Sequence, residues 1–166
     1  MGLVIFGVHV DDSISVGHKQ ALEEFAKQLA KAYDIKRLGE LEEFLGIKIV
    51  RNLETGEVFV SQLDIIKDII NDFGEKVANV KPIEAPMAKY ETIIRPEEGD
   101  LWVNAEEHKE YQSGVGKLMW LVQNMQPDLA NSVCELSKVL NGPTPGNYKS
   151  LLRVVKFTIV TKNKVL

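Results

Sequence analysis

The chain has 166 residues, of which 45% are hydrophobic and 27% are charged, and its formal net charge is −4. These values are typical of a globular protein and exclude a disordered chain, and no apolar run approaches the roughly 20 residues that cross a membrane. The run Leu3–Phe6 is too short for a signal peptide and the single cysteine, Cys134, excludes an internal disulfide, so we expect a soluble, intracellular, cytoplasmic protein with Cys134 in its core.

The first expected element is a β-hairpin. Leu3–Val10 is rich in β-branched and aromatic residues and predicts a buried strand, and Ser13–Val16 alternates polar and apolar residues like a second strand. The two residues between them, Asp11 and Asp12, match the length of a tight hairpin turn. Apolar residues then recur at three- and four-residue steps, which predicts a helix from His18 to Tyr33.

A second hairpin and a second helix are expected next. Phe44–Arg51 predicts one strand, Asn52–Gly56 a turn and Glu57–Gln62 the returning strand. Leu63–Phe73 carries isoleucines at helical spacing, and Gly74 follows as the expected helix stop.

The rest of the chain is expected to be a long connection followed by helices. Residues 75–105 show no clear period and contain three prolines. Helices are predicted from Glu106 to Met125, from Pro127 to Leu140 and from about Asn147, although the β-branched run Phe157–Thr161 is unfavourable for helix. The order of elements predicts an α+β fold divided into residues 1–74, 75–105 and 106–166.

Charge is spread unevenly along the chain. The stretch Glu91–Glu110 contains seven acids and two bases. After Glu135 there are no acids but six bases, namely Lys138, Lys149, Arg153, Lys156, Lys162 and Lys164. This basic segment either contacts phosphates or is a solvated helix face, and the sequence leaves both interpretations open.

The Asp11–Asp12 pair is the feature that points most directly to chemistry. Two adjacent carboxylates at a hairpin tip repel one another, so they need solvent or a cation. One interpretation is a simple turn, because aspartate is a good turn former. The other is divalent metal binding, because Mg²⁺ prefers carboxylate oxygens, and two such ions about 3.5–4 Å apart support phosphoryl transfer.

A series of motifs in a fixed order favours the metal interpretation. The segment Val8-His9-Val10-Asp11-Asp12 resembles the catalytic hairpin of copia-type retrotransposon reverse transcriptases, in which a tyrosine and a small apolar residue usually precede two aspartates. Further segments are similar to that family's signatures in the same order, namely Leu38-Gly39-Glu40-Leu41, Phe44-Leu45-Gly46-Ile47, Ser61-Gln62, Ala85-Pro86-Met87, Val115–Leu121, Pro127-Asp128-Leu129-Ala130, Leu136-Ser137-Lys138, Pro143-Thr144 and Arg153-Val154.

The resemblance implies a partial polymerase palm followed by a helical thumb or connection. It implies RNA-directed DNA synthesis with Mg²⁺ or Mn²⁺ on Asp11 and Asp12, and an RNA/DNA template-primer as partner, within virus-like particles in the family. Phe44–Gln62 is similar to the primer-grip hairpin. On this basis the expected nucleic-acid-binding residues are His9, Lys48, Arg51, Lys149, Arg153 and Lys156.

Several expected parts of such an enzyme are not found in this sequence. The third carboxylate and the fingers would precede Met1, and ribonuclease H would follow the last helix. We therefore expect the chain alone to be inactive and to bind Mg²⁺ or Mn²⁺ weakly or not at all. His9 replaces the family's tyrosine, Gln126 replaces the arginine before Pro127, and the family's last motif is not recognisable after Phe157.

Two alternatives and one structural consequence follow. The chain is either a polymerase fragment or a non-catalytic module of the same fold that binds nucleic acid or protein. An incomplete palm sheet would expose an edge and apolar surface, so we expect self-association as a two-fold dimer.

The segment Gly114-Val115-Gly116-Lys117 lacks the full phosphate-loop pattern. It is interpreted as a site of helix packing, and Trp120 is expected in the core.

Overall fold

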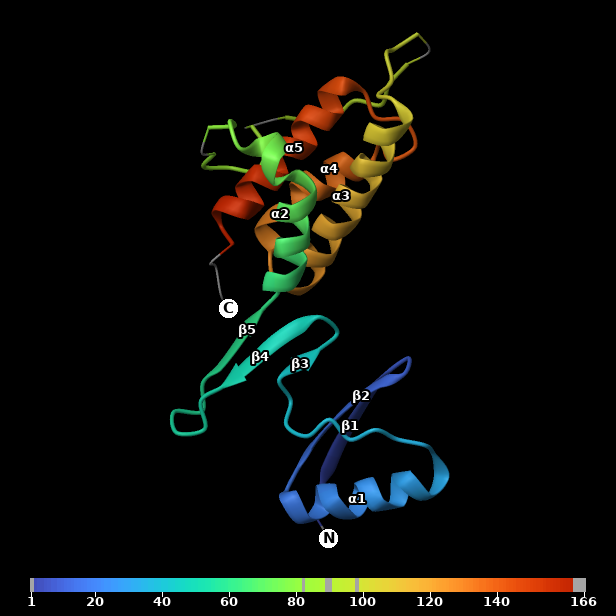
Figure 1. The fold of residues 1–166 in the computed structure, drawn as a ribbon, viewed down its shortest axis with the longest axis vertical. Helices are drawn as coiled ribbons and strands as arrows, with labels where there is room; N and C mark the ends of the chain where they lie inside the picture. The colour runs from blue at the N-terminus through green and yellow to red at the C-terminus, as the bar shows by residue number, and fades with distance from the viewer. Residues whose placement is uncertain (1, 82, 89–90, 98, 163–166) are drawn as a thin grey trace. The chain divides into compact units, whose positions relative to one another are not determined.

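The computed structural model describes residues 2–81, 83–88, 91–97 and 99–162. The chain divides into two compact units, Met1–Val60 and Ser61–Leu166. Small sheets and helices are both present, which confirms the expected α+β class (Figure 1). Among the described helices, none combines the length and the apolar character that a membrane crossing requires.

The first unit begins with the expected hairpin, shifted by one residue. Strands β1 (Val4–His9) and β2 (Asp12–Gly17) pair antiparallel, with His9 opposite Asp12 at the closed end. The loop residues are therefore Val10 and Asp11 rather than the predicted Asp11 and Asp12. Val10 has a φ of 57°, because the first position of such a short loop requires a positive φ.

Helix α1 (Lys19–Ala32) covers one face of this hairpin, as its apolar stripe predicts. The Phe6 and Phe25 rings meet edge-on with centroids 5.0 Å apart. Side chains alternate between the two faces of a strand, and no second layer within the unit covers the opposite face, so Ile5 is 64% exposed. The prediction of a buried first strand is therefore wrong for this unit.

A second sheet follows, with strand order β3-β4-β5. Its strands are β3 (Glu43–Phe44), β4 (Ile47–Arg51) and β5 (Val58–Ser61). The prediction of one strand over Phe44–Arg51 is wrong, because Leu45 and Gly46 adopt φ values of 51° and 72° and form a two-residue turn. The expected turn before β5 is present, and the Asn52 side-chain oxygen accepts hydrogen bonds from two backbone N–H groups in it.

The second unit is a helical bundle (Figure 1). Its elements are α2 (Leu63–Val77), α3 (Ala105–Asn124), the short 3₁₀ helix η1 (Pro127–Leu129), α4 (Ala130–Ser137) and α5 (Pro145–Val160). A Cβ added at Gly114 would lie 2.9 Å from Phe73 and 3.1 Å from Leu151, so α2, α3 and α5 meet at this glycine. The packing interpretation holds for Gly114 but not for Gly116, which has nothing within 4 Å.

Three helix ends differ from the sequence prediction because of tertiary packing and capping. Gly74 does not end α2, which continues to the buried Val77. Helix α5 begins at Pro145, where Thr144 and Asn147 form a capping box, and it continues through the buried Phe157 to Val160. Helix α4 ends at Ser137, three residues before the predicted Leu140.

Two side chains expected in the core lie at the surface. Cys134 is exposed, because its neighbour Val133 and the nearby Leu136 face the bundle and Cys134 faces away. Trp120 is 37% exposed while Leu118 and Leu121 on the same helix are fully buried. Apolar neighbours in the sequence therefore did not show whether Cys134 and Trp120 lie on the buried or the exposed face of their helices.

Candidate metal and nucleic-acid site

The structure brings three predicted site residues together at the tip of the first hairpin. Asp11 is in the loop, Asp12 opens β2, and His9 lies opposite Asp12. All three are exposed. Directly opposed residues of an antiparallel pair have Cβ atoms about 4.5–5.5 Å apart, so the His9 imidazole and the Asp12 carboxylate are close enough to contact one ligand.

Val10 is a further residue of the tip that sequence reasoning missed. A β-branched residue with a φ of 57° is strained, since its Cβ disfavours the left-handed region. Backbone strain of this kind persists at sites where it sets the direction of functional side chains. The sequence did not indicate a positive φ at Val10, because valine is typical of a strand and not of a turn.

The tip supplies the correct donor type for magnesium but not a complete site. Carboxylate oxygens are the ligands that Mg²⁺ prefers, and the ion requires near-octahedral coordination. Within the described residues, no group of three or more His, Cys, Asp or Glu side chains is arranged to hold a metal ion. Asp11 and Asp12 therefore do not fit a magnesium site without a further ligand.

The predicted basic residues of the second sheet have acidic neighbours. The Arg51 guanidinium pairs with the Glu40 carboxylate at 3.3 Å. Lys48 lies opposite Glu43 in the β3–β4 register. Their positive charges are partly offset within the unit, and their predicted contact with nucleic acid stays a prediction.

The predicted basic residues of α5 share one side of that helix, because their spacings of four and three residues follow the helical repeat. Lys156 donates a hydrogen bond to the Val77 carbonyl at 3.0 Å, where it stabilises the C-terminal end of α2. Arg153 donates to the Ala85 carbonyl at 3.5 Å, and Lys149 is exposed. Two of the three bases therefore contact their own chain, and Lys164 lies outside the described residues.

A polar cluster of α2, α3 and α5 was not foreseen. Glu110, from the acidic stretch, accepts hydrogen bonds from the Lys76 ammonium and the Tyr148 hydroxyl. The bond with Lys76 holds the pKa of Glu110 below its usual value, and the bond with Glu110 raises the pKa of Lys76. Burial raises the pKa of Tyr148. We call these three residues the Lys76–Glu110–Tyr148 cluster.

Comparison with known proteins connects this chain with retrotransposon polyproteins. A family model described as reverse transcriptase (RNA-dependent DNA polymerase) matches residues 1–89. The chain is 28% identical to a retrovirus-related Pol polyprotein from transposon TNT 1-94 of Nicotiana tabacum, over 93% of this chain and 12% of that protein. It is 25% identical to a putative transposon Ty5-1 protein of Saccharomyces cerevisiae, over 99% of this chain and 52% of that protein.

A third relative has no function in its name. An uncharacterized mitochondrial protein of Arabidopsis thaliana is 26% identical over 90% of this chain and 59% of its own length. The chain thus spans between 12% and 59% of the length of these relatives. A comparison with solved structures gives no match.

The family match covers more than half of the 166 residues, and it includes the hairpin with the two aspartates. The chain therefore belongs to the reverse transcriptase (RNA-dependent DNA polymerase) family and corresponds to part of a copia-type retrotransposon polymerase.

Proposed function

We propose that the chain contributes the catalytic hairpin of a retrotransposon reverse transcriptase, with Asp11 and Asp12 as two of its metal ligands. The observation that carries this proposal is the placement of both carboxylates at an exposed β-hairpin tip beside a strained Val10. A third carboxylate from outside the described residues would complete the cation site. Mg²⁺ or Mn²⁺ bound there would supply the electrostatic stabilisation for nucleotidyl transfer.

The remaining regions have proposed roles in the same enzyme. Residues 1–74 would form part of a palm, with the β4–β5 hairpin as the primer grip, and residues 106–166 would belong to a thumb or connection. Template-primer contacts would come from His9, Lys48 and Arg51, and from Lys149, Arg153 and Lys156 on α5. A two-fold dimer in the cytoplasm stays a prediction, supported by the exposed Ile5 and Val16 and testable by light scattering.

An activity test requires the missing parts to be supplied. Residues 1–74 would replace the corresponding segment of a reverse transcriptase of this family whose primer extension has been measured beforehand. We expect the chimera to extend a primed RNA template, and the isolated chain not to do so. In the presence of Mg²⁺, the double variant Asp11→Asn/Asp12→Asn of the chimera should extend the primer at least about a hundredfold more slowly than the unmodified chimera.

A matched control separates the role of the tip from a general loss of charge. Glu23 and Glu24, on α1, are another adjacent acidic pair in the same unit. Glu23→Gln/Glu24→Gln should leave extension nearly unchanged, because the exposed Glu23–Arg37 ion pair contributes little to stability. Equal activity of the Asp11/Asp12 variant and the unmodified chimera would contradict the proposal.

A further inference from the structure

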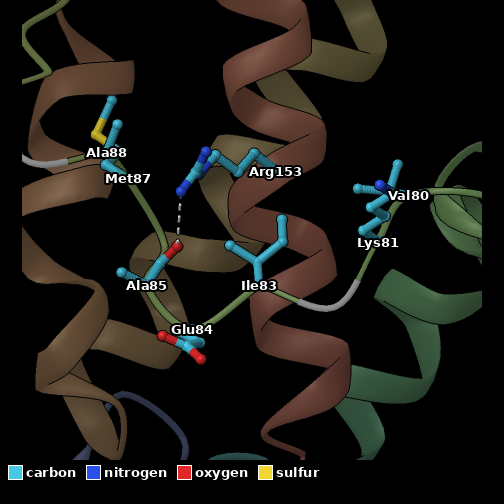
Figure 2. A pocket seen from close by; sticks show the side chains of 8 residues that line it. All are labelled: Val80, Lys81, Ile83, Glu84, Ala85, Met87, Ala88 and Arg153. Atoms are coloured by element: carbon cyan, nitrogen blue, oxygen red, sulfur yellow. Dashed lines mark hydrogen bonds between the residues drawn. The ribbon is translucent and has the colours of Figure 1, made fainter.

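A groove on the second unit has no assigned role in the proposed polymerase function, except that its residue Arg153 is one of the proposed template-primer contacts. It lies between the segment that follows α2 and the side of α5, and its volume is about 570 Å³ (Figure 2). Its lining residues are Val80, Lys81, Ile83, Glu84, Ala85, Met87, Ala88 and Arg153. Sites for small molecules usually measure between about 300 and 1,000 Å³, so the groove is large enough for one.

The guanidinium of Arg153 has too few acceptors in this groove. Figure 2 shows it reaching from α5 toward Ala85, whose carbonyl accepts a hydrogen bond from it at the long distance of 3.5 Å. Its Nε is buried and has no hydrogen-bond partner among the residues that the structure describes. No carboxylate in the described part of the chain forms an ion pair with it. A buried donor without an acceptor is costly, so the arrangement favours an external anion.

The charges and walls of the groove define the kind of anion. Lys81 and Arg153 are positive and Glu84 is negative, which leaves one net positive charge among the lining residues. Ile83 and Met87 provide apolar surface in the same groove as Arg153, and Figure 2 shows Ile83 below Arg153 in this view. A planar guanidinium matches a carboxylate through two parallel hydrogen bonds.

We propose that this groove binds a small organic acid. The carboxylate of the ligand accepts hydrogen bonds from the Arg153 guanidinium, whose side chain shifts on binding so that its buried Nε–H faces the groove, and the apolar body of the ligand packs against Ile83 and Met87. The proposal is independent of the metal-binding role of Asp11 and Asp12, which lie in the other unit.

The test uses four probes on the full chain: phenylpropionate, acetate, inorganic phosphate and phenylpropanol. The readout is the NMR signal of the Arg153 Nε–H group, observed in the unmodified protein. We expect phenylpropionate to shift this signal and to bind at least about tenfold more tightly than each of the other probes, because it alone combines a single carboxylate with an apolar body.

Two variants locate the binding. Arg153→Met keeps the apolar stem but removes the donors, and it should weaken phenylpropionate binding about tenfold or more. Lys149→Met removes an exposed cation from the preceding turn of α5 and should change the affinity by less than about twofold. Thermal melting followed by circular dichroism checks that both variants fold.

Three outcomes would overturn the proposal. The first is an Arg153 Nε–H signal in the unmodified protein that phenylpropionate does not move. The second is phosphate binding as tightly as phenylpropionate, which would indicate a phosphate site. The third is equal loss of affinity in the two variants, which would indicate a general effect of positive charge.

Discussion

The two units use apolar residues in opposite ways. In the second unit, apolar side chains from α2 to α5 form one core, including the fully buried Ile69, Leu118 and Leu151. In the first unit, none of the described residues 2–60 is buried, although its strands are rich in valine and isoleucine. Ile5 and Val16, which lie opposite one another in the hairpin, are both mostly exposed.

This difference shows what apolar periodicity does and does not establish. Four helices can surround a core within one unit, whereas a two-stranded sheet covered by one helix leaves its other face bare. An apolar strand thus marks a surface that requires cover, and the cover need not belong to the same stretch of chain.

The largest predicted contrast compares the same substitution in the two units. Leu118→Ala removes a fully buried side chain from the bundle and should lower the free energy of unfolding of that unit by about 3–4 kcal/mol. Leu3→Ala removes an exposed side chain and should change stability by no more than about 0.5 kcal/mol. Urea unfolding measures both, and equal effects would show that the first unit has a core of its own.

A smaller contrast tests the close contact of three helices. Gly114→Ala places a methyl group against Phe73 and Leu151 and should destabilise the bundle by about 1–3 kcal/mol. Gly116→Ala, two residues away on the same helix, meets open space and should stabilise it by up to about 1 kcal/mol. Thermal melting of the two variants should shift in opposite directions, and a shift in the same direction would contradict the packing described.

The smallest predicted effect concerns the Lys76–Glu110–Tyr148 cluster. Glu110→Gln should cost about 1 kcal/mol at neutral pH, since the cluster is partly exposed. The pKa of Glu110 is lower in the folded chain, so the carboxylate stabilises the fold above its ordinary pKa of 4.5. That stabilisation is lost as the pH falls below 4.5 and through the folded-state pKa.

The pKa of Lys76 is raised, so its contribution is complete below 10.5 and is lost only as the pH rises beyond its folded-state pKa. Unfolding measured at pH 7 and at about pH 3 should therefore show a smaller difference between the unmodified chain and Glu110→Gln at the lower pH. A difference of the same size at both pH values would rule out the carboxylate as its source.

Local sequence signals identified most elements and the two candidate metal ligands. The hairpin, α1 and the start of α2 follow from periodicity, and Asp11 and Asp12 were found because adjacent carboxylates are unusual between apolar strands. Positions set by backbone conformation were missed, since neither Val10 nor Leu45 is typical of a positive φ.

Long-range contacts explain the other differences. Lys76 and Tyr148 are 72 residues apart in the sequence, so no local pattern connects them. Gly74 predicted a helix end, but burial of Val77 outweighs the local preference of one glycine. The same limit applies to Arg153, whose contact with Ala85 depends on the path of the segment after α2.

The most direct test of the metal-binding role is a Mn²⁺ titration of the chain observed by NMR. The account predicts that Mn²⁺ first broadens the backbone amide signals of Val10, Asp11 and Asp12, and that Asp11→Asn/Asp12→Asn abolishes this while Glu23→Gln/Glu24→Gln does not. Broadening that begins at other acidic positions and leaves the hairpin tip sharp would contradict it.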